Sequence, residues 1–179
     1  GGYVPSKSYC LKYRMLKRIY ESEIGKEVSD ITWRRVTSIL KREFDFKVEG
    51  SNAASLVVMI GEFRRKCGTF NLKSEDHKER WEAFKHFHEM NKEFSGKGFL
   101  NALANYLKIE LKDVPRSTKY YWFNKAGISY QSNQMYGNKD LALVAFIACK
   151  WAINKRPVVM KSANPEAYKL TIGRSNNNG

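Results

Sequence analysis

Basic side chains recur on one side of the segment 32–43. Trp33, Val36 and Leu40 follow one another at spacings of three and four residues, which predicts an amphipathic helix with these residues turned inward. The polar residues then face outward or lie at the edge of the buried face: Arg34, Arg35, Ser38, Lys41 and Arg42. The planar guanidinium group of arginine donates two parallel hydrogen bonds and therefore suits guanine edges and phosphates. The alternative is an ordinary solvated helix face.

A second stretch, PRSTKYYWFNKAG at residues 115–127, combines aromatic and basic residues between Pro115 and Gly127. Proline at its start and glycine beyond its end predict a short helix. We expect Trp122 and Phe123 to pack in the core. The candidate contact residues are Arg116, Lys119, Tyr120, Tyr121, Asn124 and Lys125. Asparagine can pair with adenine, and tyrosine can bond phosphate or stack, although both tyrosines could instead belong to the core.

The charge of the chain favours a polyanionic partner. Thirty-two Lys and Arg stand against 18 Asp and Glu, so the net charge is +14. Nucleic acid is the commonest partner of such a surplus. From residue 111 onward there are 11 basic residues and three acidic ones, whereas the segment 75–93 holds six acids. We therefore do not expect the segment 75–93 to face a phosphate backbone.

The triplet HFH at residues 86–88, with tyrosines further along the chain, resembles the metal-binding triplet and tyrosine of rolling-circle endonucleases. Those enzymes need both histidines on one side of a strand. Here the triplet lies in a strongly helical pattern, and on a helix His86 and His88 diverge by about 200°. The sequence also contains no phosphate-binding loop, no dinucleotide fingerprint and no zinc-protease motif. We expect no enzyme activity, no metal and no cofactor.

The remaining pattern predicts an all-α fold. Helices are expected at 8–22, 53–66, 75–94, 99–109 and 139–156, besides the two described above. Leu11, Met15 and Ile19 mark the expected inward face of the first of these. The segments 53–66 and 139–156 are apolar almost all round and should be central in the fold.

The order of elements occurs twice, at an offset of 86 residues. An amphipathic helix, a second amphipathic helix and an apolar helix follow one another in both halves, and the matched pairs are Val28 with Val114, Thr32 with Thr118, Val36 with Trp122 and Leu40 with Ala126. This order is typical of helix-turn-helix domains, whose second helix enters the major groove. Two unrelated helical triplets are the alternative. We predict tandem helix-turn-helix-like units at 3–70 and 97–160, a connecting acidic helix at 71–96 and a flexible tail at 161–179.

These observations predict a sequence-specific binder of duplex DNA: a transcription regulator, or an accessory factor of replication, partition or recombination. One alternative is an RNA or single-strand binder in which Tyr120, Tyr121 and Tyr130 stack on bases. Another is a helical nucleocapsid-type assembly protein. The three cysteines form no CxxC pair, which favours a reducing compartment. We expect an intracellular protein, cytoplasmic in a prokaryote or phage host and nuclear in a eukaryote, with no membrane partner. The target site and the oligomeric state stay open.

Overall fold

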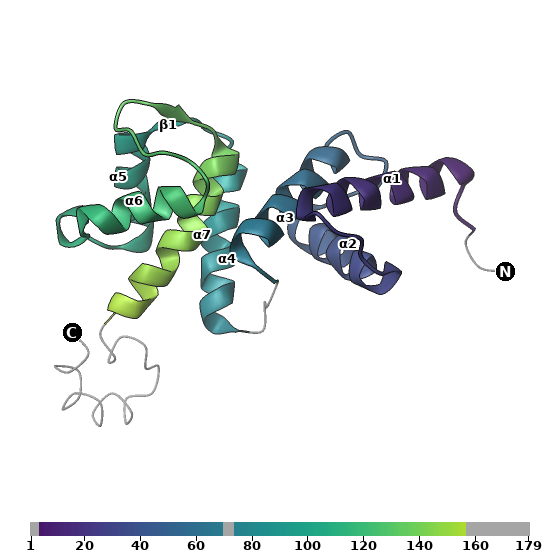
Figure 1. Cartoon of the computed structure of the whole chain (residues 1–179), viewed down its shortest axis with the longest axis horizontal. Coiled ribbons are helices and arrows are strands. Elements are labelled where there is room, and N and C mark those ends of the chain that lie inside the picture. Colours follow the sequence, from purple (N-terminus) through teal and green to yellow (C-terminus); the bar gives the residue numbers. More distant parts are fainter. Residues whose placement is uncertain (1–3, 70–73, 157–179) are drawn as a thin grey trace, which may run out of the picture. The chain divides into compact units, whose positions relative to one another are not determined.

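The computed structural model describes residues 4–69 and 74–156 (Figure 1). Helices dominate both described ranges, accompanied by one short 3-10 helix and a sheet of two very short strands. The predicted all-α fold is therefore confirmed. The chain forms two compact units, one up to residue 70 and one from residue 71. The expected tail at 161–179 lies outside the described residues.

The first unit consists of α1 (Lys7–Ile24), α2 (Asp30–Phe44) and α3 (Ala53–Cys67). Two of these helices begin where a serine hydroxyl accepts a backbone hydrogen bond, from Tyr9 N to Ser6 Oγ at 3.0 Å and from Thr32 N to Ser29 Oγ at 3.1 Å. Gly25, with φ of 77°, ends α1 in the left-handed conformation that glycine tolerates best. The caps therefore set where α2, the first candidate contact helix, begins.

The core of the first unit forms where α3 packs along α1 and contacts α2. Trp33 of α2 is 1% exposed, and its ring lies 5.8 Å from that of Tyr13 and 5.7 Å from that of Tyr20. A Cβ at Gly61 of α3 would lie 2.6 Å from Cβ of Glu23, so only glycine allows α1 and α3 to approach this closely. Trp33 thus anchors α2 on the aromatic face of α1.

The inward face of α1 differs from the sequence prediction. Leu11 and Met15 are 60% and 53% exposed, whereas Leu16 and Tyr20 are buried. Tyr9, Tyr13, Leu16 and Tyr20 recur at spacings of four, three and four, so α1 carries two helical stripes. The aromatic stripe packs inward because its larger rings remove more apolar area from water against Trp33.

The second unit begins with α4 (Glu75–Met90) and ends with α7 (Asn138–Lys155). Between them lie β1 (Phe94–Ser95), α5 (Gly96–Leu107), the 3-10 helix η1 (Leu111–Asp113), α6 (Arg116–Lys125) and β2 (Met135–Tyr136). The two strands pair antiparallel, with Phe94 opposite Tyr136. Residues 141–149 of α7 are all buried, which confirms that this apolar helix is central.

The acidic helix has a different place from the one we expected. Instead of connecting two units, α4 packs along α7 inside the second unit (Figure 1). The buried side chains Trp81, Phe84 and Phe87 form its inward stripe. Arg80 lies over the Phe146 ring at 4.1 Å and donates from Nε to the Phe146 carbonyl at 3.0 Å. The acids of α4 therefore occupy the outer side of a core helix.

The two units differ in their parts. The second has a fourth helix, the β1–β2 pair and the longer connection 108–115, which contains η1, before its candidate contact helix. Two of the matched pairs, Val36 with Trp122 and Leu40 with Ala126, are buried in both units. The proposed duplication stays a hypothesis, because shared burial at these positions is also expected of two unrelated amphipathic helices.

Candidate nucleic-acid interface

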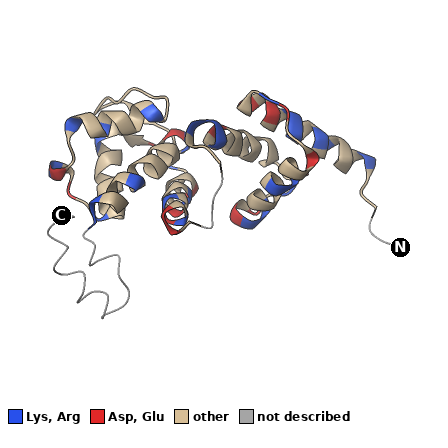
Figure 2. Cartoon of the chain, turned by 60° about the horizontal axis from the view of Figure 1, so that its bottom comes forward, with Lys and Arg blue, Asp and Glu red and all other residues tan. Residues whose placement is uncertain are grey.

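The outward face of α2 is a basic strip. All five sequence-predicted residues of this helix are exposed: Arg34, Arg35, Ser38, Lys41 and Arg42. Residues 31–42 contain no acidic residue, and Figure 2 shows Lys and Arg along the helix. The opposite face of α2 is buried as predicted, through Trp33, Val36 and Leu40. The basic side chains therefore point to solvent. The strip presents four positive charges on a helix held by its opposite face.

Within α2, carboxylates lie only at the two ends of the helix. Asp30, at the start of α2, pairs with Lys17 of α1 at 2.9 Å, and this hydrogen bond lowers the pKa of the Asp30 carboxyl. At the other end, Arg42 Nε lies 3.5 Å from Glu43 Oε1. The Ser38 hydroxyl donates to the Arg34 carbonyl at 2.9 Å. Ser38 therefore offers a ligand only its acceptor lone pairs.

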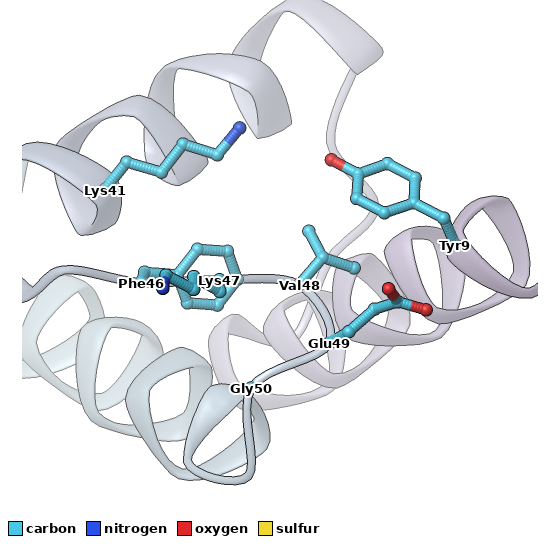
Figure 3. A pocket seen from close by; sticks show the side chains of 7 residues that line it. All are labelled: Tyr9, Lys41, Phe46, Lys47, Val48, Glu49 and Gly50. Atoms are coloured by element: carbon cyan, nitrogen blue, oxygen red, sulfur yellow. The ribbon is translucent and has the colours of Figure 1, made fainter. Parts of the chain in front are cut away.

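A shallow hollow of about 390 Å³ continues the strip at the C-terminal end of α2 (Figure 3). Its lining comes from α1, α2 and the loop that follows α2: Tyr9, Lys41, Phe46, Lys47, Val48, Glu49 and Gly50. Phe46 and Val48 are buried, whereas Lys41, Lys47 and Glu49 are exposed around them. Two ammonium groups beside one carboxylate suit an anionic backbone at the rim better than a buried small ligand.

In the second unit, the solvent-exposed face of α6 carries basic, amide and aromatic side chains. Of the sequence-predicted residues, Arg116, Tyr121, Asn124 and Lys125 are exposed, and Lys119 and Tyr120 are half-buried. The expected core residues Trp122 and Phe123 are buried. Residues 114–139, which include the whole helix, contain no acidic residue. The helix thus presents cationic, amide and phenol groups together, with no carboxylate among them.

The tyrosines of α6 have different surroundings. The Tyr120 ring meets the Tyr130 ring edge-on at 5.4 Å, and the Arg116 guanidinium lies 5.4 Å from the centre of the Tyr120 ring. Arg116 also donates to the Tyr120 hydroxyl at 3.4 Å, and this bond raises the pKa of Arg116. Tyr121 is 56% exposed. Tyr120 therefore braces Arg116, while Tyr121 offers the larger ring surface to a partner.

The loop after α6, which we name the amide loop (residues 128–136), is a polar surface that sequence reasoning passed over. Its exposed tip consists of Gln131, Ser132, Asn133, Gln134 and Met135. The sequence alone indicates little more than a polar connection here. The sequence does contain one indication of this surface. Residues 114–139 lack Asp and Glu, so the absence of acidic side chains on α6 continues through the loop.

The HFH triplet lies inside α4, as predicted, and its rings contact different partners. His86 stacks on Tyr106 with ring centres 4.4 Å apart, and His88 stacks on Phe84 at 5.9 Å. Burial lowers the pKa of His88. In residues 4–69 and 74–156 no group of three or more His, Cys, Asp and Glu side chains is arranged to hold a metal ion. None of the three cysteines, all of which lie in the described residues, forms a disulfide.

Comparison with known protein families, with curated proteins and with solved structures finds no match for this chain. Every helix in the described part of the chain is too short or too polar to pass through a lipid bilayer. We therefore infer function from the two helix faces and their side chains. Guanidinium, ammonium and amide groups on convex helices can pair with phosphates and with base edges.

Proposed function

We propose that the chain binds double-stranded DNA sequence-specifically through α2 and α6, as a regulator or as an accessory factor of replication, partition or recombination. The observation that carries the proposal is the outward strip of α2. Four exposed basic side chains line one face of a capped helix whose opposite face is anchored by Trp33, and no acid interrupts them. An α-helix of this kind fits the major groove, which is about 12 Å wide.

We expect α2 and α6 to contact different bases, with lysines binding the phosphates. Lysines neutralise phosphates and set the register, and this part of the binding energy carries no sequence information. Arg34 and Arg35 can each donate two hydrogen bonds to the O6 and N7 acceptors of guanine. Asn124 on α6 can pair with the donor and acceptor of adenine. The two helices are therefore expected to prefer different base pairs.

Duplex DNA suits this surface better than a single strand does. Stacking on single strands needs several accessible aromatic faces along a basic groove. Of the three tyrosines that we considered for stacking, Tyr120 and Tyr130 are half-buried and pack on each other. Tyr121 alone of these three is largely exposed. We therefore expect single-stranded DNA and RNA to compete poorly with duplex DNA for this surface.

Replacing both arginines of the strip, Arg34→Ala with Arg35→Ala, is expected to weaken binding to a specific duplex by at least about 30-fold, because two bidentate base contacts of roughly 1–3 kcal/mol each add up to about 2–6 kcal/mol. Stability should change by less than about 0.5 kcal/mol, since both side chains are exposed. Fluorescence anisotropy measures the affinity, and urea unfolding measures the stability.

The matched control removes the same charge from the same unit. Arg14 and Arg18 are exposed on α1, so Arg14→Ala with Arg18→Ala lowers the net charge equally without touching α2. We expect a loss of less than about threefold from this control, since it removes long-range attraction but no contact in the groove. Equal losses from the two double variants would show that α2 contributes only charge, and the proposed reading role would be abandoned.

A further inference from the structure

The amide loop is neutral and polar where it meets solvent. Its residues 128–136 contain no Lys, Arg, Asp or Glu, and three of the five side chains at its exposed tip are amides: Gln131, Asn133 and Gln134. Each amide carries both donors and an acceptor. Such a tip adds little non-specific attraction to phosphates, but it can form directional hydrogen bonds with a polar ligand.

Hydrogen bonds hold the loop in one conformation. The Tyr136 hydroxyl donates to the Ser129 carbonyl at 2.6 Å and accepts from Gln131 N at 2.8 Å. At the start of α5, Gly96 N donates to the Gln134 carbonyl at 2.9 Å, and Lys97 N donates to the Ser132 carbonyl at 3.0 Å. Apart from the Tyr136 hydroxyl, these bonds use backbone groups of the loop, and the amide side chains of the tip are exposed to solvent.

Close packing against α5 reinforces this conformation. A Cβ at Gly96 would collide with the carbonyl oxygen of Gln131 and would also meet the Tyr130 ring at 2.9 Å. The loop therefore lies directly on the backbone of the first turn of α5. Because the backbone is already ordered, binding through the tip would cost little further conformational entropy.

The loop is also attached to the proposed contact helix. Tyr130 lies with its ring 5.4 Å from that of Tyr120 and 4.9 Å from that of Phe123, both on α6. Tyr136 contacts Phe123 as well, at 5.6 Å between ring centres. The exposed tip is thus held next to α6 by a cluster of four aromatic rings.

We propose that the amide loop is a further sequence-reading element besides α2 and α6, and that it contacts base edges beside those contacted by α6 in the same duplex. This inference rests on the proposed function. Asn and Gln are the side chains that pair bidentately with adenine, and an apolar side chain such as Met135, which is 56% exposed, can contact a thymine methyl. The loop therefore favours A·T pairs flanking the site of α6.

The test is a selection of bound duplexes from a random pool, carried out with the full chain and with a loop-tip variant. The loop-tip variant combines three substitutions: Gln131→Ala, Asn133→Ala and Gln134→Ala. The variant should lose the preference for A·T at one block of positions, by about 10- to 100-fold per lost bidentate contact. Its affinity for duplexes of random sequence should stay within about threefold, because no charge is removed. The preference that depends on Asn124 should persist.

A matched variant controls for the loss of three exposed amides from the second unit. Asn101, Asn105 and Asn154 are exposed on α5 and α7, and their replacement by alanine should leave the selected sequence unchanged. Far-UV circular dichroism and the thermal midpoint verify the fold of both variants. If the wild type selects a sequence and the loop-tip variant selects the same one, the inference is wrong while the proposed function stands. If the wild type binds no duplex, the proposed function and the inference fail together.

Discussion

Raising the salt concentration from 50 to 200 mM is expected to lower the affinity of the chain for duplex DNA by about 10³–10⁵-fold. Six basic side chains are available to phosphates besides Arg34 and Arg35, which are assigned to base edges: Lys41, Arg42, Lys47, Arg116, Lys119 and Lys125. Six phosphate contacts lie at the lower end of the range of roughly 6–10 for which such a loss is typical, since each contact releases condensed counterions. A plot of log affinity against log salt, measured by fluorescence anisotropy, gives the number of contacts directly.

The variants of α2 supply the internal check on that slope. Removing Lys41 and Arg42, which are assigned to phosphates, should make the slope shallower by about 1 for each, whereas removing Arg34 and Arg35 should change it less. A control that lacks Arg14 and Arg18 should keep the slope of the wild type. An affinity that hardly responds to salt would mean that the positive surface does not face phosphates, and the nucleic-acid proposal would have to be withdrawn.

The replacement Trp33→Ala should destabilise the first unit by roughly 3–5 kcal/mol. The Trp33 side chain is buried between Tyr13 and Tyr20, so its removal leaves a cavity at the contact of α2 with α1. Urea unfolding followed by far-UV circular dichroism should show an earlier transition. Duplex binding should also weaken at temperatures where the first unit of this variant unfolds.

Trp33→Phe is the matched control for that cavity, since it keeps an aromatic ring between the two tyrosines. It should cost clearly less than Trp33→Ala because less buried surface and volume are lost. If Trp33→Ala left the unfolding transition unchanged, Trp33 would not anchor α2. The outward orientation of Arg34 and Arg35, which depends on that anchor, would then need another explanation.

Helix positions and the two contact faces could be predicted because they follow from local rules. The spacing of Trp33, Val36 and Leu40 by three and four residues decides which side of α2 is buried. The same periodicity separates Trp122 and Phe123 from the exposed residues of α6. Each of these predictions needs only neighbours within a few turns of the chain.

The features that sequence reasoning missed depend on distant partners. On α1 two stripes compete, and the ring of Trp33 from another helix decides that the tyrosines pack inward. The role of α4 depends on its fit along α7, which follows it by some fifty residues, as in the bond from Asn138 to the His88 carbonyl. The amide loop is ordered by Gly96, far before it in the sequence. Local periodicity carries no information on such contacts.

The most direct test of sequence-specific duplex binding is an unbiased selection from a random duplex pool in the presence of single-stranded DNA and RNA as competitors. We predict one enriched, asymmetric site, with guanine preferred in the part contacted by Arg34 and Arg35 and adenine preferred where Asn124 binds. The variant Asn124→Ala should relax the preference only at the adenine position that Asn124 contacts, by about 1–3 kcal/mol. An enriched palindrome would indicate a symmetric dimer with one reading helix per chain. A pool that shows no enrichment, or binding that the competitors abolish, would contradict sequence-specific binding of duplex DNA by this chain.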